Sequence, residues 1–301
     1  MKSFISLAKA AVIGWKADFA SSMGAALAYY TVFSIAPLLV IAIAIAALVF
    51  GHEIAKQEIL AQARDMLGAQ GAAGLQAMLE RAQQPHAGTF ASALSAIALM
   101  FGALGVFNEL ETDLNKIWKL TTAQPSGIWA LLRARLVSFG MIIAIGFLLL
   151  VSLIVSAALA AWGKYWAAWF VNIQVVLQIA NFALSFAVIT VLFALIYKFL
   201  PRTHVRWRDV WVGAAVTALL FTIGKFAIGL YLGRSMVASS YGAAGALAVL
   251  LLWVYYAAQI FLLGAEFTKA YADRHSAPLQ RRTAHSSDGH DTVERCAPRV
   301  R

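Results

Sequence analysis

Six long apolar stretches alternate with shorter polar segments along the chain, and this pattern predicts a bundle of membrane-spanning helices. A transmembrane helix needs about 20 mostly apolar residues, because each residue adds about 1.5 Å and the hydrocarbon core is ~30 Å thick. The stretches that meet this requirement are 27–50, 87–107, 136–162, 175–200, 210–232 and 243–264. We therefore predict an all-α integral membrane bundle of six transmembrane helices, formed by residues 1–272.

The N-terminal segment has the periodicity of a helix that lies on the membrane surface. Lys2, Lys9 and Lys16 recur every seven residues and form one stripe beside an apolar arc. This pattern predicts an interfacial amphipathic helix over residues 1–23, with its lysines toward the headgroups. Asp18 falls within the apolar arc and departs from the pattern. The alternative is that the segment is simply the solvated start of the first span.

Two further polar segments lie outside the spans. Residues 51–86 show helical periodicity on both sides of glycines at 68, 71 and 74, and they predict a short extracytoplasmic helical hairpin. The alternative here is a solvated loop with no gating role. Residues 273–301 contain few apolar side chains and predict a disordered, basic, cytoplasmic tail.

The composition excludes a soluble protein and explains the positive charge. Hydrophobic residues make up 61% and charged residues 13% of the chain, whereas soluble domains are about half apolar and a quarter charged. Of the 24 Lys and Arg residues, eighteen lie on one side of the predicted bundle, five on the other, and Lys225 within it. This asymmetry predicts cytoplasmic termini. Membrane lipids are therefore the expected partners of the net charge of +10, and no nucleic acid is expected.

The residues that carry metal or nucleotide chemistry are scattered or missing. The single cysteine, Cys296, lies in the predicted tail without an intrachain partner, and the six histidines form no metal-ligand motif. A glycine-rich phosphate-binding loop is also absent from the sequence. We predict no metal, no cofactor and no catalytic residue.

Lys225 is the only Lys, Arg, Asp or Glu well inside a predicted span. A charged group at the centre of a membrane helix costs at least ~2.5 kcal/mol on insertion scales. Ala214 and Ala218 share its helical arc, and Leu219 and Phe226 lie opposite, so the lysine points into the bundle. No acidic residue lies at its depth. This arrangement favours an anionic substrate or a wet polar cavity; the alternatives are snorkelling to the outer headgroups and a neutral lysine held by hydroxyls.

Other polar residues within or beside the spans are candidate substrate-binding residues. At the depth of Lys225 we expect hydroxyl or amide groups. The first span adds a proline, and prolines interrupt helices at transporter sites. The alternative is that this proline has no functional role, since prolines are common in membrane helices. One stripe of the last span carries an amide and an acid. The candidates, with Lys225, are Tyr30, Ser34, Pro37, Ser152, Asn181, Ser185, Gln259 and Glu266. We expect Glu266 near Trp118 at the cytoplasmic face, paired with Arg206 or Arg208 or exposed at an entry site.

Seven short stretches resemble the YihY/BrkB family of bacterial inner-membrane proteins, formerly labelled the ribonuclease BN family. They are LAYYTVFSIAPL at 27–38, LNKIW at 114–118, WRDV at 207–210, GKF at 224–226, GLY at 229–231, YG at 241–242 and LGAE at 263–266. The resemblance covers about residues 10–272. It implies a six-helix inner-membrane protein linked to envelope or lipid transport, and it supplies no substrate. Its motifs include Tyr29, Tyr30, Pro37, Asn115, Trp118, Lys225, Tyr241 and Glu266.

Together these observations predict a multi-pass inner-membrane protein that transports or binds an anionic solute or lipid for envelope homeostasis. One alternative is the membrane-bound ribonuclease of the old family label, which requires a clustered metal site on the cytoplasmic face. The other is a non-transporting envelope assembly or scaffold protein, which requires no polar cavity around Lys225.

Overall fold

The computed structural model describes residues 2–83, 105–120, 140, 148, 151, 173–203, 205–234 and 242–294, and the elements in these ranges are α-helices. The all-α prediction is confirmed for this part of the chain. The helices are α1 (Lys2–Ala17), α2 (Ala20–Phe50), α3 (His52–Gln83), α6 (Ile173–Phe199), α7 (Trp207–Arg234) and α9 (Gly242–Glu294), with a further helix over residues 105–117. Most of the predicted spans 87–107 and 136–162 lies outside the described residues.

Three of the described helices are long and apolar enough to cross a membrane. The qualifying segments are Gln178–Phe199 in α6, Trp207–Ile228 in α7 and Leu247–His275 in α9. They coincide with three of the predicted spans, and α2 contains a fourth, 27–50. The described part of the chain therefore has the helices of a membrane protein, as the hydropathy pattern predicts.

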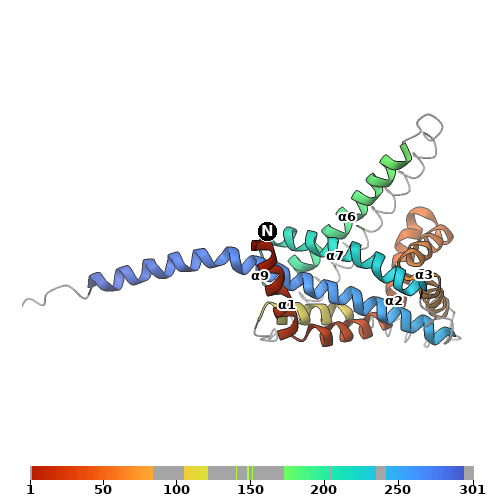
Figure 1. Cartoon of the computed structure of the whole chain (residues 1–301). Helices are drawn as coiled ribbons and strands as arrows, with labels where there is room; N and C mark the ends of the chain where they lie inside the picture. The colour runs from red at the N-terminus through yellow and green to blue at the C-terminus, as the bar shows by residue number, and fades with distance from the viewer. Residues whose placement is uncertain are drawn as a thin grey trace, which may run out of the picture.

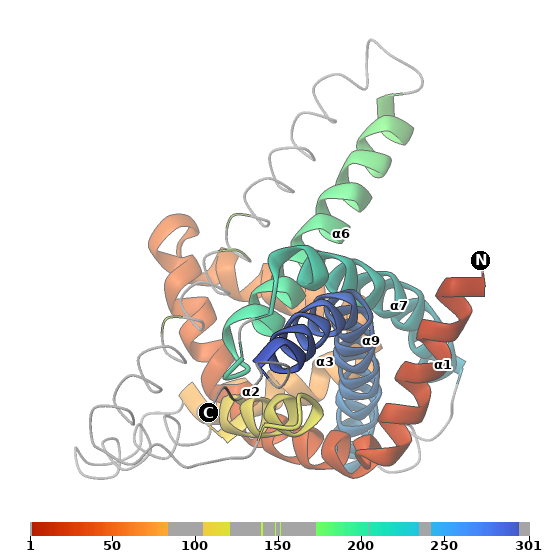
Figure 2. The same cartoon turned by 90° about the vertical axis from the view of Figure 1, so that its left-hand side faces the viewer.

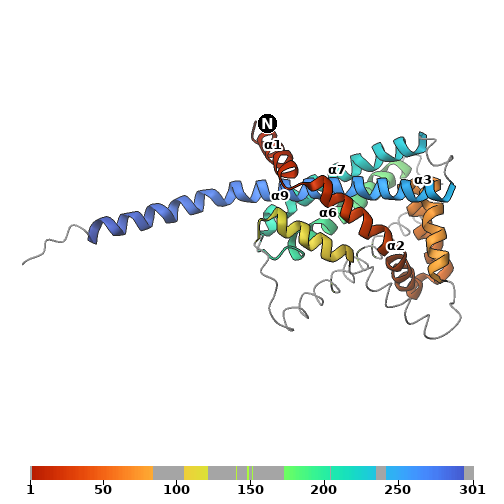
Figure 3. The same ribbon diagram turned by 90° about the horizontal axis from the view of Figure 1, so that it is seen from below.

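Helix α9 is the central element of the fold. It packs against α1, α2, α3 and α7, and α6 packs against α7 (Figures 1 and 3). The largest core cluster includes Leu262 of α9, Leu114 of the 105–117 helix and Tyr197 of α6, each of which is almost fully buried. The apolar face of α9 is thus covered along most of the predicted span.

Glycine and threonine pairs let α7 and α9 approach closely, and we call this contact the crossing. A Cβ atom at Gly213 of α7 would overlap the Thr268 hydroxyl of α9, and one at Gly264 of α9 would overlap the Thr217 hydroxyl of α7. Each threonine therefore occupies the space that the opposite glycine leaves open. Small residues at the contact are the usual solution for membrane helices, which gain stability from close packing.

A break at residues 18 and 19 separates α1 from α2, so the predicted N-terminal helix ends at Ala17 rather than at residue 23. Phe19 adopts the left-handed conformation, with a φ of 57°, and redirects the chain. Before the break, Leu7 and Ala11 are buried against Phe267 of α9. The apolar contacts of α1 are thus made in part with the bundle itself.

Helix α3 folds back on itself at one end of the molecule (Figure 1). Ala55 and Leu79 share one core cluster, and Ala63 and Leu75 share another. In a straight helix, Ala55 and Leu79 would be about 36 Å apart, because they are 24 positions apart in the sequence. Helix α3 must therefore bend sharply. Its helical conformation nevertheless continues through the glycines between the two halves.

Beyond the predicted span, α9 runs on as a helix to Glu294, where the sequence predicts a disordered tail from residue 273. The extension projects away from the other helices (Figures 1 and 3). The extension carries few apolar residues and therefore has no broad apolar face to pack in a core.

Candidate functional site

Lys225 lines a pocket between α6 and α7, and we call it the Lys225 pocket. Its volume is about 220 Å³. Polar groups come from both helices, and aromatic and aliphatic side chains supply the remaining wall. The lining residues are Gln178, Asn181, Phe182, Ser185, Phe186, Ile189, Thr222, Lys225 and Phe226. Of these lining residues, Lys225 is the charged one, so the pocket carries a positive charge beside amide and hydroxyl groups.

The local sequence of α7 turns Lys225 toward α6. Gly224 faces α9, because a Cβ atom there would lie 2.6 Å from Ile260 Cδ1. The next side chain along the helix therefore points away from α9. The Lys225 ammonium lies 5.5 Å from the centroid of the Phe226 ring, a distance at which a cation and an aromatic ring attract each other.

The two faces predicted for α7 agree with its burial. Ala214 and Ala218 are fully buried, while Leu219, Ile223 and Phe226 are more than half exposed. The small residues contact neighbouring helices, and the large apolar ones point outward. A membrane would cover these outward side chains with lipid.

The structure brings Asn181 and Ser185 of the predicted set to Lys225, whereas Ser152 and Tyr241 lie outside the described residues. The candidates of the first span belong to α2 and are not part of the pocket lining. Tyr30 is exposed and contacts the Tyr29 ring at 5.7 Å between centroids.

Ser34 and Pro37 occupy the same helix as Tyr30. The buried Ser34 hydroxyl donates to the Tyr30 carbonyl at 3.0 Å, so its hydrogen bond is used within α2. The backbone of α2 stays helical through Pro37, whose side chain is not among those that the structure describes.

Gln259 and Glu266 form a second polar region, around the break between α1 and α2. Gln259 Nε2 donates to the Ala20 carbonyl at 3.4 Å. Glu266 is 3% exposed and lies against the backbone of α1 at Gly14. The charges that act on Glu266 are those of Lys269, Asp18 and Lys119.

The predicted neighbours of Glu266 are therefore correct in part. Lys119 directly follows Trp118, so Trp118 and Glu266 lie at the same end of the bundle. Arg206 and Arg208 are not among the charges that act on Glu266, and the carboxyl group is buried rather than exposed. The physical reason is that α1 folds back along α9 and covers this carboxyl group.

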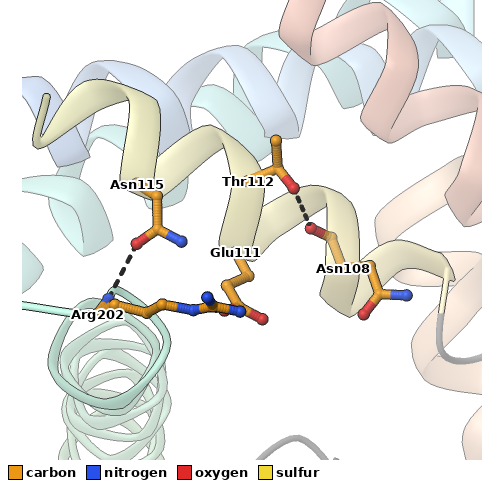
Figure 4. A network of polar contacts seen from close by, with 5 residues as sticks. All are labelled: Asn108, Glu111, Thr112, Asn115 and Arg202. Carbon is orange, nitrogen blue, oxygen red and sulfur yellow. Dashed lines mark hydrogen bonds and ion pairs between the residues drawn. The ribbon is translucent and has the colours of Figure 1, made fainter. Parts of the chain in front are cut away.

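The 105–117 helix is fastened to the end of α6 by a small polar network (Figure 4). Asn115 is buried, and its Oδ1 accepts a hydrogen bond from the Arg202 backbone N–H at 2.9 Å. Arg202 Nε donates to Glu111 Oε1 at 2.5 Å, and the Thr112 hydroxyl donates to the Asn108 carbonyl. Asn115, which the resemblance picks out as a motif residue, therefore connects two helices.

Asp113 is a buried acid on the same helix. Burial and the nearby charge of Glu109 raise the pKa of Asp113 from 3.8 to about 7, and Lys116 opposes the change. Its Oδ2 atom is buried without a hydrogen-bond partner in the described ranges. The sequence analysis does not single out this acid, because its burial depends on packing against other helices.

Sequence reasoning also missed Asp18, Gln178 and Thr222. Asp18 had a signal, since it interrupts an otherwise apolar arc. Gln178 lies three residues before Asn181 and seven before Ser185, and this helical spacing would have placed all three on one face of α6. Thr222 lies three residues before Lys225, a helical spacing that places both side chains on one face of α7.

These features define a class: an α-helical membrane protein in which a cationic pocket lies between two of its apolar helices. Residues 12–289 match the family model described as Virulence factor BrkB. The chain belongs to this family, and the resemblance seen in the sequence is confirmed.

Relatives of similar sequence are named UPF0761 membrane proteins. One from Cronobacter sakazakii is 34% identical over 190 residues, covering 60% of each chain. One from Verminephrobacter eiseniae is 32% identical over 185 residues, covering 61% of this chain and 42% of its own. One from Stenotrophomonas maltophilia is 27% identical over 268 residues, covering 86% and 59%. The chain thus spans less than two thirds of each of these relatives, and no solved structure matches it.

Proposed function

We propose that this protein binds an anionic solute or an anionic lipid headgroup at the Lys225 pocket, as a step in moving it across or within the inner membrane. The observation that carries the proposal is the lysine itself, which lies beside amide and hydroxyl groups of α6 in a pocket of about 220 Å³. An ammonium group offers three hydrogen-bond donors and no acceptor, so it favours a ligand with negative charge or acceptor oxygens.

The composition of the pocket wall supports a ligand with both polar and apolar parts. Asn181 and Ser185 line the same pocket as Lys225, and both side chains can donate to a phosphate or carboxylate oxygen. Phe182 and Phe226 are more than half exposed and can contact an acyl chain or a lipid tail. Ligand sites in helical membrane proteins commonly lie between helices, with a few polar groups in an apolar wall.

We further propose that the chain has six membrane spans, with both termini in the cytoplasm and α3 on the outer side. The support is the eighteen-to-five distribution of basic residues in the sequence. In this orientation Lys225 lies nearer the outer side of the membrane, and Glu266 lies toward the cytoplasm.

The binding proposal is tested with the purified full chain in lipid nanodiscs. We expect Lys225→Met to lose most of the retention of phosphatidylglycerol, or of inorganic phosphate, measured against phosphatidylcholine by native mass spectrometry and by phosphate titration. Retention of the lipid but not of phosphate would identify a headgroup site; the reverse would identify a solute site.

Two matched variants separate charge from position. Lys225→Arg keeps the charge and should retain at least part of the binding, whereas Arg64→Met removes a charge from an exposed position of α3, outside the pocket lining, and should bind as the wild type does. Wild-type retention of both ligands by a folded Lys225→Met would refute the proposal and favour the scaffold alternative.

A further inference from the structure

Two acids from distant parts of the sequence meet where α1 joins α2. Glu266 belongs to α9, and Asp18 stands in the break before α2. A Cβ atom at Gly14 would overlap Glu266 Oε2, and the Asp18 backbone N–H donates to the Gly14 carbonyl at 2.8 Å, so the two carboxyl groups are neighbours. An ionised carboxylate only accepts hydrogen bonds, whereas a protonated carboxyl group also donates one. A hydrogen bond between two carboxyl groups therefore requires a proton, and we call these residues the carboxyl pair.

The surroundings of the carboxyl pair do not compensate two negative charges. Glu266 is 3% exposed, and Asp18 Oδ2 and Glu266 Oε1 are both buried without a hydrogen-bond partner among the described residues. A buried carboxylate that lacks partners is costly, and two carboxylates in contact repel each other. One bound proton removes one charge and supplies the missing donor.

The charged groups around the pair come from several elements. Lys119 acts on it from just after the 105–117 helix and Lys269 from α9 itself, while Asp18 directly follows the last residue of α1. On α7 the nearest acid to the crossing is Asp209, whose charge is not among those that act on Glu266. The described residues contain no group of three His, Cys, Asp or Glu side chains that could hold a metal ion.

We propose that Asp18 and Glu266 form a binding site for a single proton, and that this proton holds the α1–α2 junction against α9. Gly14 lets the α1 backbone lie directly over the Glu266 carboxyl group. The contact between α1 and α9 therefore depends on whether the carboxyl pair holds its proton. When the proton leaves as the pH rises, the two carboxylates repel, and α1 separates from α9. The site lies apart from the Lys225 pocket and does not depend on the function proposed for it.

The test measures the separation of α1 and α9 in the full chain in nanodiscs, with Cys296 replaced by Ser. Spin labels are attached to Ala10→Cys in α1 and His275→Cys in α9, both at exposed positions. Pulsed electron paramagnetic resonance then measures the distance between the two labels. For the wild type we expect a short, narrow distance distribution at low pH that becomes longer and broader as the pH rises. Over the same range, the infrared carbonyl band of a protonated carboxyl group should decrease.

Glu266→Gln and Asp18→Asn each replace an acid by an amide that donates the same hydrogen bond at every pH. Both variants should therefore keep the short distance throughout, and either alone is sufficient if the other does not fold. Asp273→Asn, an exposed acid on the same helix, should behave as the wild type does.

Three results would overturn the proposal. The first is a wild-type distance that does not change with pH, and the second is a wild-type pH response in both amide variants. The third is restoration of the short distance by Na⁺ at high pH, which would make the pair a sodium site instead.

Discussion

The two ends of the contact between α6 and α7 differ in packing. Toward the C-terminal end of α6, Tyr197 donates to the Phe261 carbonyl of α9 at 2.7 Å, and the Phe193 ring lies 5.8 Å from that of Phe221. Toward the other end, α6 diverges from α7 (Figures 1 and 2), and the Lys225 pocket lies between them. We call these the closed end and the open end.

The difference shows how one helix can serve stability and binding at once. At the closed end α7 presents Gly213 and Thr217 to α9, and the polar groups there bond to other protein groups. At the open end its lysine faces a space lined by polar and aromatic groups. Rigid packing along one part of a helix can hold a binding group in place farther along it.

The largest effect should follow from filling the crossing at the closed end. In Gly264→Ala the new methyl group would overlap the Thr217 and Tyr197 hydroxyl groups, whose hydrogen bonds are buried. We expect a loss of about 3 kcal/mol in unfolding free energy, since overpacking and broken buried hydrogen bonds both contribute. The measurement is unfolding of the purified protein in mixed micelles.

Gly140→Ala is the matched control, because a Cβ atom at Gly140 would meet no atom of the described residues within 4 Å. Its stability should stay within about 0.5 kcal/mol of the wild-type value. Equal effects of the two substitutions would contradict the assignment of close packing to the crossing.

A pH-dependent effect of intermediate size is expected from Asp113, which lies in a helix that packs at the closed end. The folded protein raises the pKa of Asp113 to about 7, so it binds this proton more tightly than the unfolded chain does. Stability therefore falls as the pH rises from about 4 through 7. Asp113→Asn should remove this slope. Above pH 7 it should add on the order of 2 kcal/mol, because partial solvation reduces the full effect of about 1.4 kcal/mol per pKa unit.

The pH dependence is measured as the melting temperature of both proteins between pH 4 and 8. Asp273→Asn again serves as the control, since this acid is exposed. Parallel curves for the wild type and Asp113→Asn would show that the Asp113 carboxyl group is not held protonated by the fold.

The helices could be predicted well from the sequence, because a long apolar segment in a membrane is expected to form a spanning helix. The helical segments near 27–50, 175–200 and 210–232 follow directly from the requirement for about 20 apolar residues. Depth along the helices also singled out Asn181 and Ser185 as groups at the level of Lys225, and the structure brings both to the pocket.

Contacts between elements could not be predicted in the same way. Asp18 stood out only as a defect in an apolar arc, because nothing in the local sequence shows that α1 folds back along α9 to meet Glu266. Likewise, the packing role of Gly213 and Gly264 could not be predicted, because it depends on the threonines that lie opposite them in the fold. Periodicity describes each helix by itself, and the partner of each face depends on how the whole chain packs.

The smallest effect is expected from one substitution made at both ends of α7. Thr217 is fully buried at the closed end, where its hydroxyl donates to the Gly213 carbonyl of its own helix and also lies 3.2 Å from the Tyr197 hydroxyl of α6. Thr222 lines the pocket at the open end, and its hydroxyl donates to the Ala218 carbonyl of its own helix. We expect Thr217→Val to lower the unfolding free energy by about 1 kcal/mol and Thr222→Val to change it by less than about 0.5 kcal/mol, because only the first removes a buried polar contact between helices. Unfolding in mixed micelles measures both variants. A larger loss for Thr222→Val would mean that the open end contributes more to stability than its packing indicates, and the division between the two ends would then be wrong.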